Sequence, residues 1–514
     1  MSSAPSICDT EKTACVLDAP TLVEASQLQE KAPVSSRPSP KGWQKVAIVS
    51  VLSSAQFFDI FNACASIAAL PSIGTALNFT PGVLQWVLAA YTLTFASLQV
   101  PAGRLTDLYD AKLIFCIGYL GLGLFSILCA VSVHPIMLVV FRAISGIGAA
   151  MTIPSAIAMI VHNFPDPKEQ SAVLGIYGAF GAIGNAGGFV IGGIVSAKAS
   201  WRWVFYIIAI AAIPFSVFAY FFLPKIESAQ KEKRSLDFPG ISILTGGLIL
   251  LVYALSDGSD QGWGTPQIIV TLMFSIVFFI AFFVVERITK DPALPPRLWH
   301  ITNLAVMFFY SMSVYWNLFA IELQLTKVFQ DLFLWSPFKA ALHFLPLGKY
   351  TIFHDLNLYS LFYSGITGGI SATLAGQYGH LIPRRILLVV SQMLMLVASI
   401  LLALAHSPDR YWSYVLPAMI INMVGLAGSY VGATVTTMAS APKGEEGVVG
   451  AVLYTTFQLG STLGIAVAAA ISLSVNEKLP LDALSQFTGY AASFWSLVGM
   501  HGIMIVITLL FVHN

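Results

Sequence analysis

Residues 103–130, GRLTDLYDAKLIFCIGYLGLGLFSILCA, contain the two patterns from which the fold is predicted. A charged segment ends at Lys112, and the chain then carries no charged residue from Leu113 to Ala130. Such a run is close to the ~20 residues that a helix needs to cross a hydrocarbon layer about 30 Å thick. It is too long for a barrel strand of about 10 residues, and polar and apolar side chains do not alternate in it. The stretch therefore predicts a transmembrane helix preceded by a charged loop.

The composition extends this prediction to nearly the whole chain of 514 residues. Hydrophobic residues make up 57% of the chain and charged residues 10%, whereas soluble domains carry roughly 25% charged residues. The 26 basic and 25 acidic residues nearly cancel, so the chain lacks the uniform positive field that attracts nucleic acid. We therefore expect most of the chain to face a lipid bilayer, and we exclude nucleic acid as a partner.

Fourteen apolar runs divide the chain into regions. Residues 1–45 are polar, rich in Ser, Pro and Glu, and lack the apolar core of a signal peptide, so we expect a disordered cytoplasmic tail. Residues 46–223 contain six runs and predict an N-terminal six-helix bundle, and residues 224–239 form a charged cytoplasmic connector. Residues 240–300 contain two linker transmembrane helices, and residues 301–514 supply a C-terminal six-helix bundle. The predicted fold class is an all-α polytopic membrane protein.

The distribution of Lys and Arg predicts the orientation, because cytoplasmic loops carry an excess of both. With the N-terminal tail inside, the inner loops hold roughly three times as many Lys and Arg residues as the outer loops. An even number of crossings then places both termini in the cytoplasm. No sorting signal is recognisable, so we expect the plasma membrane, and we expect a monomer.

No motif predicts enzymatic or metal chemistry. The five cysteines are scattered without a CxxC pair, which favours packing roles over a disulfide framework or a metal site. The chain has neither a Walker sequence nor an HExxH motif. We therefore predict neither ATP hydrolysis nor a bound cofactor.

The loop from Gly103 to Lys112 resembles the loop motif of the major facilitator superfamily. Gly103, Leu105, Asp107 and Lys112 match that motif, whereas Asp110 stands where the family has a second glycine. The resemblance implies two six-helix bundles with a cavity between them, and a loop that acts as a conformational latch. In this latch a glycine lets two helices approach, and an acid caps a helix and engages basic groups.

The same spacing returns from Gly376 to Arg385, with His380 at the position of Asp107, as expected for a degenerate second-half repeat. The predicted latch residues are therefore Gly103, Asp107, Lys112, Arg384 and Arg385. The alternative interpretation is an ordinary charged inner loop.

Two ionisable residues inside predicted membrane spans are candidate proton-coupling residues. Arg142 lies in mid-span, where facing lipid would cost at least about 2.5 kcal/mol, so we expect it to face a cavity. Its surroundings resemble a motif whose arginine the superfamily uses in proton coupling. Asp59 lies in the apolar segment QFFDIFN, and burial would favour its protonated form. Alternatively, Arg142 forms a structural salt bridge or reaches the membrane surface, and Asp59 pairs permanently with it or lies at the membrane edge.

The fifth apolar run carries glycines at the spacing of the antiporter motif found in drug exporters of this superfamily. The matching residues are Gly175, Gly184, Gly188, Gly192 and Gly193, and Phe189 replaces the proline of that motif. Glycines at helical steps leave a surface on which a second helix packs closely and slides or bends. The resemblance implies export, although generic helix packing also explains the glycines.

Four polar residues at membrane depth are predicted to line the substrate cavity: Asn62, Gln85, Asn185 and Gln458. The position of Asn62 corresponds to an acid in the 14-span drug:proton antiporters, and Asp59 lies about one helical turn before it. Each of the four could instead form a hydrogen bond between helices.

The resemblance extends over nearly the whole chain after the tail. Residues 57–62, FFDIFN, and residues 251–256, LVYALS, are similar to the fungal aminotriazole-resistance type of 14-span transporter. The function that it implies is proton-coupled efflux of small toxic compounds or secondary metabolites by alternating access, with a small molecule, protons and the lipid bilayer as partners. The alternatives are uptake of a small polar solute such as ammonium, and a receptor that binds a solute without moving it.

Residues 349–367 do not fit this pattern. They separate two segments that are almost contiguous in the family, and they place Lys349, His354 and Asp355 within an apolar run. Gly348-Lys349-Tyr350 can be encoded by a typical intron donor sequence. We hypothesise that these residues come from a retained intron.

Overall fold

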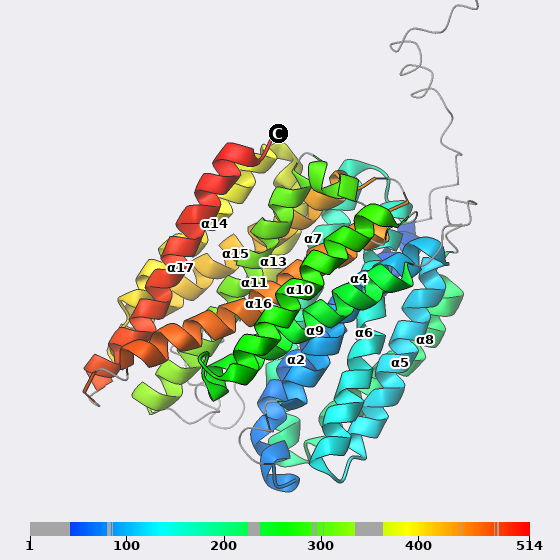
Figure 1. The fold of residues 1–514 in the computed structure, drawn as a ribbon. Helices are drawn as coiled ribbons and strands as arrows, with labels where there is room; N and C mark the ends of the chain where they lie inside the picture. Colours follow the sequence, from blue (N-terminus) through cyan, green and yellow to red (C-terminus); the bar gives the residue numbers. More distant parts are fainter. Residues whose placement is uncertain are drawn as a thin grey trace, which may run out of the picture. The chain divides into compact units, whose positions relative to one another are not determined.

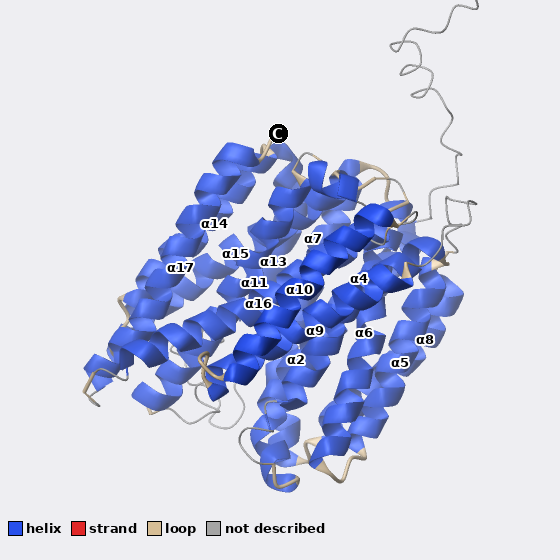
Figure 2. Ribbon diagram, in the orientation of Figure 1, coloured by secondary structure: helices blue, strands red, loops and turns tan. Residues whose placement is uncertain are grey.

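The computed structural model describes residues 42–79, 84, 86–224, 237–289, 292, 294, 296–301, 303–334, 363–442, 444–476, 479–480 and 483–513. Over these residues the chain is helical and contains no β-strand (Figure 2). The prediction of an all-α protein is confirmed.

The described residues contain fourteen α-helices of 16 residues or more. They are α2 (Gly42–Ala76), α4 (Trp86–Leu108), α5 (Ala111–Ala130), α6 (Pro135–Asn163), α7 (Pro167–Lys198), α8 (Arg202–Phe222), α9 (Phe238–Gln261), α10 (Pro266–Ile288), α11 (Leu304–Lys327), α13 (Tyr363–Tyr378), α14 (Arg384–Ala403), α15 (Leu416–Ala439), α16 (Glu446–Asn476) and α17 (Ala483–Phe511). Short 3-10 turns occupy Pro296–His300, Gly379–Leu381 and Pro408–Arg410, and π turns occupy Val328–Leu332 and Tyr411–Val415.

Twelve of these helices are long and apolar enough to cross a membrane. The two exceptions are α4 and α13, of which the structure describes 23 and 16 residues. Fourteen crossings therefore stay a prediction, and twelve candidate spans are the structural finding.

Aspartates begin three of the helices, as the preference for short polar side chains at a helix N-terminus predicts. Asp110 accepts a hydrogen bond from the backbone amide of Lys112 at the start of α5, over 3.1 Å. Asp166 caps α7 through the amide of Glu169, also over 3.1 Å. Asp237 caps α9 through the amide of Gly240 over 3.0 Å. The polar loops of the sequence thus set where the following helices begin.

Helices α2 and α4–α8 form an N-terminal half, in which α6 contacts α4 and α5, and α5 contacts α8 (Figure 1). Helices α11 and α13–α17 form a C-terminal half, in which α16 contacts α11 and α17, and α14 contacts α15 and α17. The halves meet mainly along two pairs of helices, α4 with α16 and α7 with α13, and α6 with α16 and α7 with α15 make smaller contacts. Each of the two main pairs contains one glycine-rich helix: α7 of the N-terminal half contacts α13, and α16 of the C-terminal half contacts α4.

The linker helices α9 and α10 pack against each other on the outside of the halves. Helix α9 contacts both α4 and α16, so it covers one of the two places where the halves meet (Figure 1). Helix α10 leaves large apolar side chains exposed, among them Met273, Phe274 and Ile280. Such a face is suited to lipid, because it would be costly in water.

Several predicted boundaries differ from the observed ones. Helix α2 begins at Gly42, so the last four residues of the predicted tail are helical, while residues 1–41 lie outside the described residues. Residues 225–236 of the predicted connector also lie outside them, and α9 begins at Phe238. Within the predicted insertion, residues 349–362 lie outside the described residues and residues 363–367 belong to α13.

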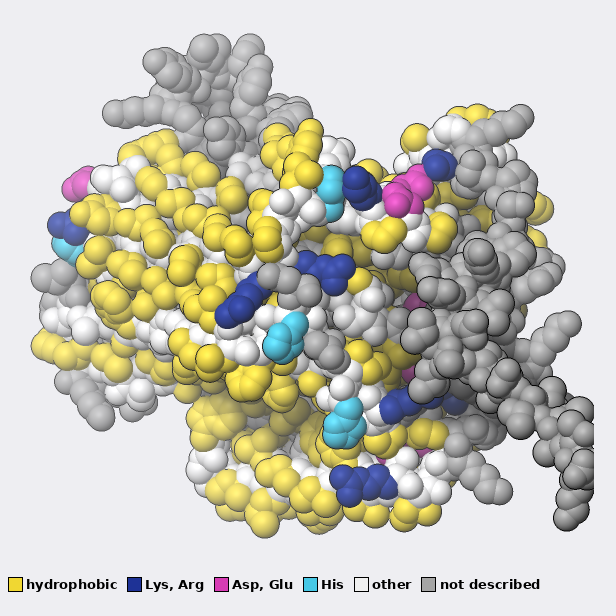
Figure 3. All heavy atoms as spheres, turned by 90° about the horizontal axis from the view of Figure 1, so that it is seen from above, with side chains coloured by type: hydrophobic (Ala, Val, Ile, Leu, Met, Phe, Trp, Pro, Cys, Tyr) yellow, Lys and Arg dark blue, Asp and Glu magenta, His cyan; other side chains and the backbone are white. Residues whose placement is uncertain are grey.

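The two ends of the C-terminal half come together at one end of the bundle. The side chain of Asn303, before α11, donates to the carbonyl oxygen of His513 over 3.0 Å and accepts from its amide over 2.8 Å. Figure 3 views this end, where the C-terminus lies, and shows separate groups of Lys and Arg side chains among hydrophobic ones.

Labelling the two ends of α7 tests the predicted orientation. Lys168 and Lys198 are both exposed and lie near opposite ends of this helix. In a background with the five native cysteines replaced by alanine, we expect Lys198→Cys to react with a membrane-impermeant maleimide on intact cells. Lys168→Cys should react only after permeabilisation, since the predicted orientation places it inside. The reverse pattern, or equal labelling of both, would contradict the orientation.

Candidate functional site

Asp59 lies at the middle of α2 and bonds to the neighbouring helix. Its carboxyl group accepts a hydrogen bond from the hydroxyl of Tyr91 on α4, over 3.1 Å. Asp59 is partly exposed, whereas Tyr91 is buried. Asp59 therefore lies far from both ends of α2, and the Tyr91 hydroxyl is a hydrogen-bond partner of its carboxyl group.

Arg142 on α6 is buried and forms its contacts within the N-terminal half. Its Nε donates to the carbonyl oxygen of Val87 and its Nη1 to the side-chain oxygen of Asn62, each over 2.9 Å. The guanidinium lies 4.5 Å from the centre of the Tyr91 ring, which is within the range of a cation–π contact. Nη2 of Arg142 has no hydrogen-bond acceptor among the described residues.

Tyr91 thus touches both predicted coupling residues, while no ion pair joins Asp59 to Arg142 among the described residues. The permanent pair left open by the sequence is absent from this conformation. A rotation of Tyr91 would change both its hydrogen bond to the Asp59 carboxyl group and its ring contact with the Arg142 guanidinium.

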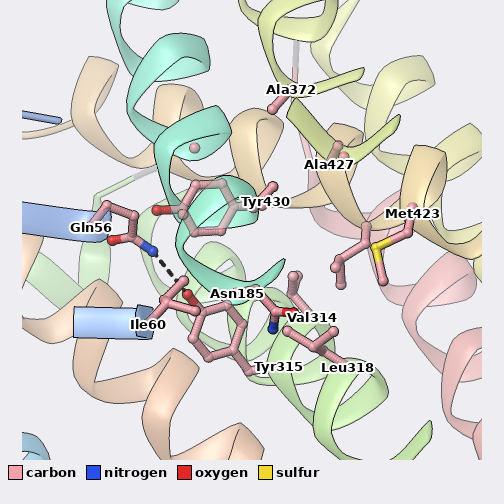
Figure 4. Close-up of a pocket in the computed structure, with 15 residues that line it drawn as sticks. Gln56, Ile60, Asn185, Val314, Tyr315, Leu318, Ala372, Met423, Ala427 and Tyr430 are labelled. Atoms are coloured by element: carbon pink, nitrogen blue, oxygen red, sulfur yellow. Dashed lines mark hydrogen bonds between the residues drawn. The ribbon is translucent and has the colours of Figure 1, made fainter. Parts of the chain in front are cut away.

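A cavity of about 80 Å³ lies between the two halves (Figure 4). Helices α2 and α7 line it from one half, and α11, α13 and α15 line it from the other. Its surface is mainly apolar, with Val314, Leu318, Met423 and Leu426 among the lining residues. Pockets for drug-sized ligands measure roughly 300–1,000 Å³, so this conformation has to widen before it holds such a molecule.

Aromatic side chains form one end of this cavity. The rings of Tyr315 and Tyr430, which both line it, are stacked with centres 6.3 Å apart. Phe457 packs 4.9 Å from Tyr315, and the hydroxyl of Tyr430 bonds to that of Tyr454. Gln56 from the N-terminal half donates to the Tyr315 hydroxyl over 3.2 Å (Figure 4). This cluster connects α2 with α11, α15 and α16.

A second carboxyl group lies one helical turn from a residue that lines the cavity. Glu322 on α11 accepts a hydrogen bond from the side-chain nitrogen of Asn185 on α7, over 3.3 Å. Asn185 lines the cavity, as does Leu318, one helical turn before Glu322. This contact joins the halves. The sequence did not predict it, because the apolar run that predicts this span covers residues 301–320 and stops before Glu322. Extending that span by one turn would have revealed an acid at membrane depth.

The four predicted cavity residues have different positions. Asn185 lines the cavity, whereas Asn62 is buried against Arg142. Gln458 is partly exposed and is not among the residues that line this cavity. Gln85 lies outside the described residues.

The glycines of α7 contact two different helices. A Cβ atom at Gly184 would lie 2.6 Å from the carbonyl oxygen of Phe57, and one at Gly188 would lie 2.8 Å from that of Phe61. Gly192 approaches Ala65 in the same way, so three of the predicted glycines pack on α2. Gly175 instead packs on Gly376 of α13, and a Cβ atom at Gly193 would meet nothing within 4 Å.

The C-terminal half repeats this packing. In α16, Gly464 packs against the backbone of Trp316 on α11, and Gly460 packs against Met312. Gly447 of α16 approaches Gly103 of α4, as Gly175 approaches Gly376. The contacts at α4 with α16 and at α7 with α13 are therefore equivalent, which agrees with two structural repeats.

Asp107 bonds across the interface between α4 and α16. Its two carboxyl oxygens accept from the backbone amides of Gly447, over 2.8 Å, and Val448, over 2.9 Å. These amides are in the first turn of α16, where free N–H groups and the helix dipole favour a negative charge by about 0.3–1 kcal/mol. Asp107 therefore caps a helix of the opposite half.

The basic residues of the predicted latch lie elsewhere. The Nζ atom of Lys112 lies 5.1 Å from the centre of the Tyr220 ring in the N-terminal half. Arg385 donates to the carbonyl oxygen of Leu509 on α17, and Arg384 is exposed. Among the described latch residues, Gly103 and Asp107 thus contact the C-terminal half, and both do so through the backbone of α16. The expectation was that the acid would also engage basic side chains.

The chain is similar to known membrane transporters. The family model described as Major Facilitator Superfamily matches residues 52–465. Puromycin resistance protein pur8 of Streptomyces alboniger is 31% identical over 85% of the chain and 82% of its own length. The multidrug transporter mfsC of Aspergillus fumigatus is 28% identical over 87% and 83% of the two chains. A low affinity ammonium transporter of Saccharomyces cerevisiae is 26% identical over 92% and 89%.

A solved structure shares the fold. The crystal structure of the human organic anion transporter MFSD10 matches with a TM-score of 0.64, over 91% of this chain and 100% of that chain. Its sequence identity is 14%, so the match concerns the fold alone.

Two alanine substitutions in α7 test the close packing of its glycines. Gly184→Ala should lower the free energy of unfolding by about 1–3 kcal/mol, because the new Cβ atom would clash with Phe57 backbone. Gly193→Ala is the matched control and should be neutral or stabilising, because its Cβ atom has open space and alanine favours a helix. Thermal unfolding in detergent measures both. Equal unfolding temperatures would show that α7 does not pack on α2 in this way.

Two aspartates three residues apart test the contact between the halves. Asp107→Ala should speed hydrogen exchange at the start of α16, because the amides of Gly447 and Val448 lose their acceptors. Asp110→Ala should affect only the start of α5, whose Lys112 amide it caps. Exchange is read by mass spectrometry on the full chain. Unchanged exchange at α16 in the Asp107 variant would refute the contact.

Proposed function

The chain belongs to the Major Facilitator Superfamily, and on this premise we propose that it is a proton-coupled exporter of small toxic compounds or secondary metabolites. The observation that carries the proposal is a small, mainly apolar cavity between the halves, with one acidic residue in each half next to a lining residue: Asp59 beside Ile60 in the chain, and Glu322 bonded to Asn185. Puromycin resistance and multidrug transport in the names of two relatives support export. Transporters of this family are not enzymes.

Alternating access is supported by where the halves touch. Gly103 with Gly447, and Gly175 with Gly376, are close backbone contacts at helix ends that the orientation assigns to the cytoplasm. Asp107 joins the first of these contacts by two hydrogen bonds. In this conformation the cavity would be closed toward the cytoplasm. Release of both contacts would open it inward by rocking the halves.

Asp59 is the proposed proton carrier. A carboxylate at the centre of a membrane is costly unless it is paired or protonated, and here a neutral hydroxyl is its hydrogen-bond partner. Protonation from the outer side would keep Asp59 uncharged while the cavity faces outward. Loss of the proton to the cytoplasm would leave a negative charge beside Tyr91 and the Arg142 guanidinium.

Arg142 is the proposed sensor of that charge. Its buried Nη2 lacks an acceptor among the described residues, and a buried charged donor without a partner is unfavourable. Ionised Asp59 would supply the acceptor once Tyr91 moves aside. The two helices that carry these residues, α2 and α6, would then shift relative to α4, which carries Tyr91.

Uptake of a small polar solute such as ammonium and solute sensing without transport are less favoured. One relative is named as an ammonium transporter, but the cavity lining here is mainly apolar, with stacked tyrosines. We further propose a monomer in the plasma membrane with both termini in the cytoplasm. The bonded pair Asn303 and His513 supports placing the C-terminus at the end where α11 begins.

Replacing Asp59 by Asn tests the coupling. In proteoliposomes loaded with puromycin, an imposed pH gradient should drive efflux by the wild type, and Asp59→Asn should lose at least about tenfold of this rate because its amide cannot carry a proton. Exchange of labelled for unlabelled puromycin without a gradient should persist in the variant. Tyr91→Phe, which keeps the carboxyl group, should retain gradient-driven efflux with an altered pH dependence.

Gradient-driven efflux by Asp59→Asn at the wild-type rate would refute the assignment of Asp59 as the proton carrier. Accumulation rather than efflux by the wild type would favour uptake, and puromycin binding without movement would favour a receptor.

A further inference from the structure

The first turn of α16 takes its N-terminal cap from the opposite half of the protein. Glu445 directly precedes α16, and its carbonyl oxygen accepts from the amide of Val449 over 2.9 Å, so Glu445 holds the N-cap position. A side chain at this position ordinarily accepts from the second or third amide of the helix. Here those amides belong to Gly447 and Val448, and both donate to Asp107 of α4. An aspartate of the N-terminal half therefore replaces the local cap.

Both acidic side chains at the start of α16 have partners of their own. Glu446 accepts from the backbone amide of Gly444 over 2.7 Å. The buried carboxylate of Glu445 forms an ion pair with Arg297, whose side chain is 63% exposed. These partners differ from the two amides that Asp107 uses, so the first turn of α16 is available to the opposite half.

The backbone that carries Arg297 is held in place independently of this ion pair. Arg297 lies in the 3-10 turn Pro296–His300, which joins α10 to α11. The ring of Trp299 in this turn packs 5.6 Å from that of Phe308 on α11 and 6.0 Å from that of Phe283 on α10. The guanidinium therefore reaches the start of α16 from a turn that is anchored to the linker and to the C-terminal half.

Glu445 would compete with Asp107 if it lost its arginine. Removing one partner of an ion pair leaves a buried charge uncompensated, which costs more than the pair itself contributes. The amides of Gly447 and Val448 follow two and three residues along the chain, and they are the usual partners of an N-cap side chain. They also lie at the positive end of the helix dipole, which favours a carboxylate.

We propose that Arg297 is a positioning residue of the inner contact: it holds Glu445 away from the first turn of α16, so that Asp107 can bind there. The inference rests on the alternating access proposed above and adds a residue of the linker to it. Withdrawal of Arg297 would release Glu445, and Glu445 would then displace Asp107. The linker helices would thereby influence when the cytoplasmic side opens.

Distances between spin labels on the two halves test this role in the purified full chain. Tyr109 and Leu381 are both exposed and lie in the connections from α4 to α5 and from α13 to α14. Nitroxides at Tyr109→Cys and Leu381→Cys, in the background without native cysteines, report separation of the halves by pulsed electron resonance. Arg297→Gln should raise the population with the longer distance at least about threefold, because Glu445 then occupies the amides.

A second substitution distinguishes competition from a simple tether. If Arg297 only tied the linker to α16, Glu445→Gln would open the inner side as much as Arg297→Gln does. Under the proposal Glu445→Gln removes the competing charge, so its longer-distance population should equal the wild-type value or fall below it. Arg297→Gln combined with Glu445→Gln should return to the wild-type value. Arg287→Gln, at an exposed arginine in the last turn of α10, is the matched control and should change nothing.

Three results would each overturn the role of Arg297: wild-type distances in Arg297→Gln, opening by Glu445→Gln alone, and a double variant that stays open. Asp107→Ala measures the inner contact itself and should also raise the longer distance. If Asp107→Ala leaves the distance unchanged, the proposed alternating access through this contact fails as well. An effect of Asp107→Ala without one of Arg297→Gln overturns the role of Arg297 alone.

Discussion

A hydrocarbon layer offers no hydrogen-bond partner, so each charged side chain within this helix bundle has to be accommodated by the protein itself. Arg142 is surrounded by an amide, a backbone carbonyl and an aromatic ring. Asp107 bonds to the first turn of α16, Asp59 to a tyrosine and Glu322 to an amide. These partners carry no formal charge, so they compensate each ion less completely than an ion pair would.

Glycine determines how closely the halves approach. Gly103 with Gly447 and Gly175 with Gly376 are equivalent contacts in the two repeats, but their polar reinforcement differs. Asp107 bonds to two amides at the first contact. At the second, Ser171 donates to the carbonyl oxygen of Gly376 over 2.8 Å, and His380, at the position of Asp107, is exposed. The two contacts therefore present the same backbone geometry with different charge.

The sequence predicted the helical class because lipid imposes long apolar runs, and the family resemblance predicted the two halves. The sequence says less about the candidate site, where the direction of a side chain matters more than its depth. Asn62 and Asn185 both lie at membrane depth, yet Asn62 faces Arg142 and Asn185 faces the cavity. Helix α2 has no distinct polar face, so periodicity does not show which face meets which neighbour. Glu322 was missed because apolar runs do not define helix ends to within one turn.

The position of α9 also restricts how a hydrophobic molecule dissolved in the bilayer could reach the centre of the protein. This helix lies against both α4 and α16 and so screens one flank of the paired halves from the surrounding acyl chains. On the other flank, α7 and α13 meet without α9 or α10 among their main neighbours. A compound partitioned into the inner leaflet would thus meet unequal lateral barriers, and sideways entry would be favoured from the flank formed by α7 and α13.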